Sequence, residues 1–288
     1  MGTTRALENK VCLVTGAGRG IGRVISLEFA KHGARLALCS RTTSEVEGVA
    51  SEVAQVCGDS PEVFKTDVSE FAEVSGMVSK ITHHFGRVDV LVNNAAVQGP
   101  IGPLWKNDVQ DWRETIEINL LGTMHCCKAV IPYMIAAQMG KIVNLSGSGE
   151  GPFPRFSAYS CSKSGVVRLT ETLAAELAEH NIQVNALAPG AVNTRFLDQV
   201  LNAGAEAGVY LQKAIKQRDG GGNSPERATK LAVFLASDDS TGITGRLFSA
   251  NWDDWRELDP NKIATSSLYQ MRRIDGVRYI EREDKRGK

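Results

Sequence analysis

Short apolar runs alternate with longer amphipathic segments from about residue 10 to residue 250 of this chain. The run 88–93 is almost continuously apolar, which is typical of a strand buried on both faces of a parallel sheet. In the segment 21–32, by contrast, Ile21, Ile25 and Phe29 form one apolar helix face. The pattern predicts strands over 10–15, 34–39, 62–66, 88–93, 141–145, 182–187 and 246–250. It predicts helices over 21–32, 43–56, 70–85, 109–139, 157–179 and 225–236.

This alternation of strands and helices indicates the α/β fold class. Right-handed crossovers place parallel strands side by side and cover both faces of the sheet with helices. We therefore expect one doubly wound domain over residues 1–250, built on a mostly parallel, seven-stranded sheet. Residues 251–288 follow as a C-terminal extension, either a tail or a subunit-contact segment. Pro132 predicts a kink or a break in the helix 109–139, and residues 195–223 are expected to form a mobile loop within the domain.

Composition narrows the function classes. Apolar residues make up 42% of the chain, charged residues 23%, and the formal net charge is zero, so neither nucleic acid nor a membrane surface is expected as a partner. The six cysteines form no C-x-x-C pair and no histidine cluster accompanies them, so we expect no metal site. Reduced, buried thiols fit a cytoplasmic protein. Residues 1–9 lack the apolar core of a signal peptide, and no apolar stretch looks long enough to cross a bilayer.

A glycine-rich loop joins the first predicted strand to the first predicted helix. Residues 15–22 read Thr-Gly-Ala-Gly-Arg-Gly-Ile-Gly. Glycines in this position let the backbone approach a pyrophosphate, and the free N–H groups of the helix start favour an anion. The strand–loop–helix setting predicts a dinucleotide site, although the spacing differs from G-x-G-x-x-G. The alternative is a plain glycine-rich turn.

The end of the second strand bears on which dinucleotide binds. Cys39, Ser40 and Arg41 stand where a carboxylate would bind an adenosine ribose, and none of them is acidic. Arg41 and Arg19 are both able to reach a 2′-phosphate, which Ser40 would not repel. We therefore expect NADP, with NAD as the alternative if the arginines are only surface charges.

Tyr159 and Lys163 lie one helical turn apart in the predicted helix 157–179. An isolated phenol ionises near pH 10, too high for efficient acid/base chemistry at neutral pH. An ammonium group on the same helix face favours the phenolate and lowers the pKa of the tyrosine. The pair alone is common on solvated helices, so its meaning depends on the other motifs.

The motifs together closely resemble the classical short-chain dehydrogenase/reductase family over roughly residues 8–250. The resemblance implies a Rossmann-type fold that binds NAD(P) and moves a hydride between the nicotinamide and a carbonyl/alcohol pair. It also implies a homodimer or homotetramer whose interfaces use the helices 109–139 and 157–179. The residues that carry it, in order, are the 15–22 loop, Asn93-Asn94-Ala95-Ala96, Asn119, Ser146, Tyr159-x-x-x-Lys163, and Pro189-Gly190 followed by Thr194.

The resemblance also assigns roles. It implies Tyr159 as general acid/base and Lys163 as the group that lowers its pKa and binds the nicotinamide ribose. It implies Ser146 as the residue that holds the substrate oxygen and Asn119 as the anchor of a water in a proton relay. The implied cofactor-binding residues are Gly16, Arg19, Gly20, Ile21, Gly22, Ser40, Arg41, Asp67, Val68, Asn93, Ala95, Tyr159, Lys163, Pro189, Val192 and Thr194.

Three positions depart from the family pattern. Ala96 stands where the family has glycine. The family commonly has two adjacent serines after the fifth strand; here counting back from Tyr159 selects Ser146, counting forward from Ile142 selects Gly147, and Ser148 is the second candidate. The third departure is the long C-terminus, with tryptophans at 252 and 255 beside aspartates, which would either line a pocket for a sugar-like ligand or anchor the tail to the body or to a neighbouring subunit.

The function that follows is an NADP-dependent oxidoreductase acting on a carbonyl or secondary alcohol, with a sugar-like or polyol substrate as one option. Residues 195–223 fall where the family keeps its substrate loop, and the extension from residue 251 is a candidate to reach a neighbour's active site. The alternative is a catalytically silent NADP-binding sensor with the same fold. A lyase or epimerase that uses its cofactor transiently is a third reading, and it would retain a cofactor that never dissociates.

Overall fold

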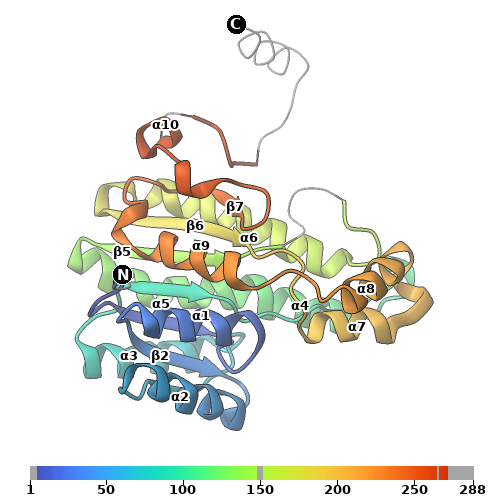
Figure 1. Cartoon of the computed structure of the whole chain (residues 1–288), viewed down its shortest axis with the longest axis horizontal. Helices are drawn as coiled ribbons and strands as arrows, with labels where there is room; N and C mark the ends of the chain where they lie inside the picture. Colours follow the sequence, from blue (N-terminus) through green and yellow to red (C-terminus); the bar gives the residue numbers. More distant parts are fainter. Residues whose placement is uncertain (1–4, 148–151, 265, 272–288) are drawn as a thin grey trace, which may run out of the picture.

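A seven-stranded parallel sheet forms the centre of the computed structural model, which describes residues 5–147, 152–264 and 266–271 (Figure 1). The strand order is β3-β2-β1-β4-β5-β6-β7, and all neighbouring strands in it run parallel. The predicted fold class is therefore confirmed, and the sheet is wholly rather than mostly parallel. The strands are β1 (Val11–Thr15), β2 (Arg35–Ser40), β3 (Glu62–Lys65), β4 (Val90–Asn93), β5 (Gly140–Leu145), β6 (Ile182–Ala188) and β7 (Leu247–Ser249).

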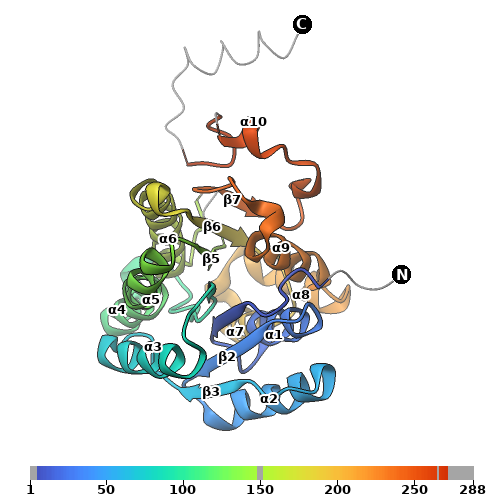
Figure 2. The same ribbon diagram turned by 90° about the vertical axis from the view of Figure 1, so that its left-hand side faces the viewer.

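Helices cover both faces of the sheet, as the view along its edge shows (Figure 2). Side chains of a strand alternate between faces, so Cys12 and Val14 enter one hydrophobic cluster and Val11 and Leu13 the other. One face carries α1 (Gly20–Lys31), α2 (Thr43–Cys57) and α9 (Glu226–Ala236). The other carries α3 (Phe71–Phe85), α4 (Val109–Ile116), α5 (Gly122–Ala137) and α6 (Ser157–Glu176).

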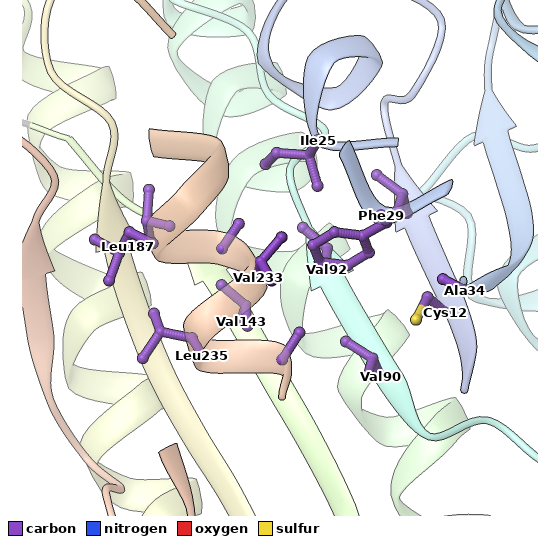
Figure 3. Packing of buried hydrophobic residues seen from close by; sticks show 14 of the residues in the cluster. Cys12, Ile25, Phe29, Ala34, Val90, Val92, Val143, Leu187, Val233 and Leu235 are labelled. Atoms are coloured by element: carbon purple, nitrogen blue, oxygen red, sulfur yellow. The ribbon is translucent and has the colours of Figure 1, made fainter. Parts of the chain in front are cut away.

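The first cluster shows how the layers are held together. Ile25 and Phe29 of α1 pack beside Val233 of α9 above the strands (Figure 3). Phe29 is fully buried, as are Val92 and Val143 beneath this layer. Full burial of side chains of this kind contributes about 1.5–3 kcal/mol each, so the two helices are fixed against the central strands.

The strand order reverses beside β1, which is flanked by β2 on one side and β4 on the other. In open α/β sheets such a point leaves a crevice outside the carboxyl ends of the strands. The turns that follow β1, β4, β5 and β6 all open at this edge. The fold therefore brings the glycine loop, the 93–96 segment and the residues after β5 and β6 to one place.

The predicted helix 109–139 is formed, but it is not regular. It consists of α4, a wider π-helical turn over Glu117–Leu121, and α5, which continues through Pro132 to Ala137. Of the kink or break expected at Pro132, the break is wrong, because α5 runs on past the proline. The irregular turn is the one that contains Asn119. Its residues, Glu117–Leu121, include no proline or glycine that would predict it.

The expectation that no segment has the length and hydropathy of a membrane span is also wrong. Within the described residues, the helix Val109–Ala137 reaches a mean hydropathy of 1.3 over an 18-residue window. This measure is satisfied equally by core helices of globular domains, and α5 packs here against α3.

Residues 195–223 carry two helices, where the sequence pattern predicted a loop. They are α7 (Arg195–Ala203) and α8 (Val209–Asp219), joined by a short 3-10 turn over Gly204–Ala207. Thr194 caps α7 by accepting a hydrogen bond from the Phe196 N–H at 3.4 Å. Phe196, Leu197, Val200 and Leu201 recur at helical spacing in α7, so the helix was readable from the sequence and the expectation of a loop is wrong. In α8 few side chains are buried and most residues are polar, which gives a weaker pattern.

The described part of the C-terminal extension packs on the same chain. Trp255 is 5% exposed and stacks near Phe234 of α9, with ring centroids 5.4 Å apart. The short helix α10 (Pro260–Ala264) lies beyond β7, where the Arg246 guanidinium donates to the Ile263 carbonyl at 2.6 Å (Figure 1). Trp252, by contrast, is 85% exposed. The two tryptophans thus have different environments.

Candidate active site

A cavity of about 1300 Å³ opens at the carboxyl ends of the strands. It extends from the glycine loop and the ends of β2 and β3, past Tyr159, to α7 and α8. Its volume exceeds the roughly 300–1,000 Å³ of ordinary small-molecule pockets, so it has room for a dinucleotide together with a second molecule.

The glycine loop presents its backbone to this cavity. Gly16 has a φ of +60°, and a Cβ there would lie 2.7 Å from the Ala95 Cα, so only glycine fits. A Cβ on Gly22 would collide with the Gly16 carbonyl oxygen. The helix α1 starts at Gly20 with no side-chain cap and no acidic residue in its first turn. Its N-terminal N–H groups are therefore suited to a pyrophosphate, and the cradle fits a dinucleotide.

Asn94 and Thr15 hold the loop in this shape. The Asn94 side-chain amide donates to the Thr15 carbonyl at 2.9 Å and to the Gly16 carbonyl at 3.0 Å. The Thr15 hydroxyl accepts from the N–H groups of Asn94 and Ala95. These bonds tie the turn after β1 to the turn after β4. The sequence motif contained both residues, but assigned no role to either side chain.

The far end of the cavity carries the arginines expected to distinguish NADP from NAD. Arg41 lies 3.6 Å from the Asp67 carboxylate and 3.7 Å from Glu114. Arg19 lies 3.5 Å from Glu45. Burial acts to raise the pKa of Asp67, but hydrogen bonds from Ser69 and the charge of Arg41 outweigh it, so the pKa is lowered and the carboxylate stays charged. Arg41 therefore lies beside Asp67, and Arg19 beside Glu45, and all four residues line the cavity.

Tyr159 and Lys163 face the middle of the cavity from α6. Lys163 is buried, and its ammonium group donates to the Leu145 carbonyl at 2.7 Å, 5.9 Å from the centre of the Tyr159 ring. Burial raises the pKa of Tyr159 to about 12 and lowers the pKa of Lys163 to about 8. The protein alone therefore does not lower the pKa of the phenol, contrary to the sequence-based expectation, because desolvation dominates.

The residues after β5 bear on which serine lies next to Tyr159. The Ser146 hydroxyl is buried and has no hydrogen-bond partner among the described residues, although Ser146 lines the cavity wall. Gly147 is the residue that faces the phenol, because a Cβ there would lie 3.0 Å from the Tyr159 hydroxyl oxygen. The second candidate, Ser148, lies outside the described residues. Ser146 is thus the described hydroxyl free to accept a new partner.

Two asparagines lie behind the cavity rather than in its wall. The Asn119 amide donates to the Val97 carbonyl and to the Ser162 hydroxyl, while its oxygen accepts from the Val97 N–H at 2.8 Å. Asn93 is buried and donates to the Asn144 side chain at 2.9 Å. Asn93 therefore does not line the cofactor cleft as expected, and the side chain of Asn119 is fully engaged in joining the 97–98 segment to α6.

An aromatic wall closes the other side of the cavity. Phe196 of α7 meets the Tyr159 ring edge-on, with centroids 5.7 Å apart. Tyr210 of α8 packs against Phe153 and Phe156. Trp252 also lines the cavity, whereas the Asp253 carboxylate beside it accepts from the Ser249 N–H at 2.6 Å. The helices α7 and α8 therefore cover the region next to the phenol with apolar faces.

Most of the predicted site residues are brought together. Gly22, Asn93 and Asn119 support the wall from behind. The predicted residues that line the cavity are Gly16, Arg19, Gly20, Ile21, Ser40, Arg41, Asp67, Val68, Ala95, Ser146, Tyr159, Lys163, Pro189, Val192 and Thr194. Phe153 lines it as well, in agreement with the apolar wall expected just before Tyr159. Gln98, Lys213 and Gln217 also line it and had not been singled out, because no motif contains them.

Comparison with known proteins agrees with this geometry. The family model of the short chain dehydrogenases matches residues 10–204. The 3-oxoacyl-(acyl-carrier-protein) reductase FabG of Thermotoga maritima is 35% identical over 242 residues, which cover 84% of this chain and 96% of that protein. The 3beta-hydroxysteroid dehydrogenase 1 of Eggerthella lenta is 32% identical over 241 residues, 83% of this chain and 91% of that protein. An NAD+-bound xylitol dehydrogenase has a similar structure, with a TM-score of 0.79, 32% identity, and coverage of 84% of this chain and 98% of the other.

The chain belongs to the short-chain dehydrogenase/reductase family. It is an NAD(P)-dependent oxidoreductase of the class that acts on CH–OH and C=O groups. The relatives differ widely in the substrates their names give, from an acyl chain to a steroid to a polyol, at similar identity. Membership therefore fixes the reaction class and leaves the substrate to the residues of the cavity.

Proposed function

We propose that this protein is an NADP-dependent reductase/dehydrogenase that interconverts a ketone and a secondary alcohol, with Tyr159 as the general acid/base. The observation that carries the proposal is the position of Tyr159 and Lys163 at the middle of one cavity, whose far end holds Arg19 and Arg41. The nicotinamide cofactor, when bound, supplies or accepts the hydride.

The residues of the chain handle the proton. In the direction of reduction, the Tyr159 hydroxyl donates its proton to the carbonyl oxygen as the hydride reaches the carbonyl carbon, and the phenol becomes a phenolate. The Lys163 ammonium stabilises that phenolate by its charge. Ser146, whose hydroxyl lacks a partner among the described residues, donates to the same substrate oxygen. Asn119 keeps the 97–98 wall and α6 in register, which is a positioning role.

The preference for NADP follows from charge. No carboxylate directly follows β2, where Ser40 and Arg41 line the cavity, so the position that would bind an adenosine ribose through an acid carries none. Arg41 is now neutralised by Asp67 and Glu114, and Arg19 by Glu45, at distances of 3.5 to 3.7 Å. These long contacts are exchanged for shorter, charge-assisted bonds to phosphate.

Arg41→Ala tests the cofactor preference. A charge-assisted hydrogen bond contributes about 1.5–3 kcal/mol, so the Kd for NADPH should rise roughly 10- to 100-fold while the Kd for NADH changes little. Both constants are measured by titrating the fluorescence of the reduced nicotinamide. Arg218→Ala is the control, because Arg218 is exposed on α8, pairs with Asp219 and does not line the cavity. Tighter binding of NADH than NADPH by the unmodified protein would refute the preference.

A polyol or keto-sugar is the substrate class we propose to test first. Trp252 offers an exposed aromatic face at the cavity, and Gln98, Lys213 and Gln217 add polar groups to its wall. The xylitol dehydrogenase neighbour is consistent with this class. NADPH oxidation is followed against a panel of keto-sugars and apolar ketones. Tight NADPH binding with no turnover on any member would favour the silent sensor instead.

We also propose a cytoplasmic homodimer or homotetramer assembled through the helix α4–α5. Val109 and Leu121 are exposed on this helix, beside Leu104 and Trp105, and exposed apolar residues gathered in this way mark contact surfaces. Light scattering on the eluted protein gives the mass of the assembly, and Val109→Asp should shift it to that of the monomer.

Truncation after Ala250 tests whether the extension reaches a neighbour's active site. Unchanged assembly and activity of the truncated protein would exclude that role.

A further inference from the structure

Among the glycines of the described residues, Gly147 is the one whose missing Cβ would face the Tyr159 hydroxyl. The three heavy atoms nearest to an ideal Cβ at this residue all belong to Tyr159: the hydroxyl oxygen at 3.0 Å, Cζ at 3.8 Å and Cε1 at 3.9 Å. A contact of 3.0 Å is tighter than nearly all real Cβ contacts. Any side chain at residue 147 would therefore project against the phenol.

The backbone gives no reason for a glycine here. Gly147 is not among the glycines with positive φ, so other residues can adopt its conformation. This distinguishes it from Gly16 and Gly20, whose φ values are +60° and +54°. What the glycine provides is the space between the end of β5 and the Tyr159 ring.

That space lies where a substrate must extend. A carbonyl oxygen that receives the Tyr159 proton lies within about 3 Å of the hydroxyl, so the carbon atoms flanking the carbonyl lie beside it. Phe196 packs edge-on against the Tyr159 ring, with the ring centroids 5.7 Å apart, and takes up part of the space around the phenol. Because Gly147 has no side chain, a substituent on a flanking carbon can be accommodated beside it.

We infer that Gly147 is a specificity-determining residue that admits ketones carrying a substituent on the carbon next to the carbonyl, as in branched, cyclic or α-hydroxylated substrates. This inference rests on the proposed carbonyl reduction at Tyr159. The missing side chain at 147 sets which substrates reach the phenol, and Ser146 remains the neighbouring hydroxyl donor.

The test compares cyclohexanone with 2-methylcyclohexanone in the full-length protein and in Gly147→Ala. One methyl group misplaced against a pocket wall changes kcat/KM roughly 10- to 200-fold. With NADPH, the ratio of kcat/KM for the methylated to the unmethylated ketone should therefore fall at least about ten-fold in the variant. Binding of both ketones in the presence of NADP+, measured by saturation-transfer difference NMR, should change in the same sense without any turnover.

Two variants serve as controls. Gly48→Ala adds a methyl on the exposed face of α2, where it meets nothing within 4 Å, and should leave the ratio unchanged. Gly147→Ser should lower the ratio as alanine does, because it adds the same Cβ. Unchanged NADPH affinity in both Gly147 variants confirms that the cofactor site is intact.

Three results would overturn the inference. An equal loss for both ketones would show that the added atom blocks the phenol without selecting substrates. A gain for both ketones in Gly147→Ser would show that a hydroxyl, not space, is what the position needs. Failure of the unmodified protein to bind either ketone would exclude a pocket of this kind. Absence of turnover with binding retained would contradict the proposed function alone, since the NMR ratio still tests Gly147.

Discussion

At the scale of single residues, burial dominates the chemistry of the site. Lys163 is buried and Tyr159 is partly buried at the cavity wall, and this desolvation disfavours the charged form of each: the pKa of the phenol rises to about 12 and the pKa of the amine falls to about 8. At neutral pH the tyrosine is therefore fully protonated and able to donate, and the lysine is mostly an ammonium. This distribution of protons is the one that carbonyl reduction requires.

Tyr159→Phe removes the donated proton and keeps the ring that packs against Phe196. General acid/base groups contribute roughly 10²- to 10⁴-fold, so kcat for ketone reduction should fall by at least about 100-fold. The Kd for NADPH should change by less than a factor of about three, which corresponds to under 1 kcal/mol of binding free energy. Steady-state kinetics and fluorescence titration measure the two quantities. If the variant keeps a kcat within ten-fold of that of the unmodified protein, Tyr159 is not the general acid/base.

The pH profile should report Lys163. Its pKa of about 8 lies below the ordinary 10.5, so the ammonium that stabilises the phenolate is present below pH 8 and is lost above it. The rate of ketone reduction should be level up to about pH 8 and fall above it, while Tyr159 stays protonated across this range. Absence of a limb between pH 7 and 9 would assign the dependence to another group.

At the scale of elements, the π-helical turn over Glu117–Leu121 places Asn119. A wider turn carries an extra residue, and it turns the asparagine toward the 97–98 segment and Ser162 at once. The Thr123 hydroxyl donates to the Asn119 carbonyl at 2.8 Å and satisfies one backbone group that the irregular turn frees. A regular helix with the same sequence would not hold these partners together.

Asn119→Ala should therefore weaken the fold and the cofactor site together. Loss of the bonds leaves the partly buried Val97 backbone groups without their partner, which costs about 1 kcal/mol of the free energy of unfolding. The loss is measured by urea denaturation. Because Val97 and Gln98 line the cavity, NADPH should also bind more weakly. Thr172→Ala, on the exposed face of α6, is the matched control, and equal stability of the two variants would contradict the positioning role.

At the scale of the whole molecule, distant parts of the chain close one core. Trp255 and Ile263 of the C-terminal extension enter the cluster that contains Phe29 of α1 and the residues of α9. Arg246 strengthens this contact by donating to the carbonyls of Ile263, Ser266 and Leu268. The described part of the extension is thus continuous with the hydrophobic core of residues 5–250.

The two tryptophans of the extension give a matched pair for testing this. Trp255→Ala opens a cavity beside Phe234 and should lower the free energy of unfolding by about 3–5 kcal/mol. Trp252→Ala removes a side chain that is 85% exposed and should change it by less than about 0.5 kcal/mol. Denaturant titration of both variants measures the difference. Equal stabilities would mean that the extension contributes nothing to the core.

Local patterns predicted most elements and failed where tertiary contacts decide. The long strands and amphipathic helices were predicted within one to three residues, since each satisfies its own periodicity. The helix α7 was missed although its apolar residues recur at helical spacing, and α8 was missed because it buries little and has no strong apolar face. The turn at Asn119 was missed because what stabilises it is hydrogen bonding to residues 22 and 43 positions away.

The sequence by itself determined the sheet, the family and the position of the glycine loop and of Tyr159 with Lys163. These features are local: the apolar periodicity, the glycine at position 16 and the i,i+4 spacing of Tyr159 and Lys163 are each set by residues close together in the sequence. Only the tertiary structure decided that Asn93 stands behind the cleft, that Gly147 faces the phenol, and that burial raises rather than lowers the pKa of Tyr159. Those outcomes depend on distances and on exclusion of water between segments remote in the chain, which no local pattern encodes.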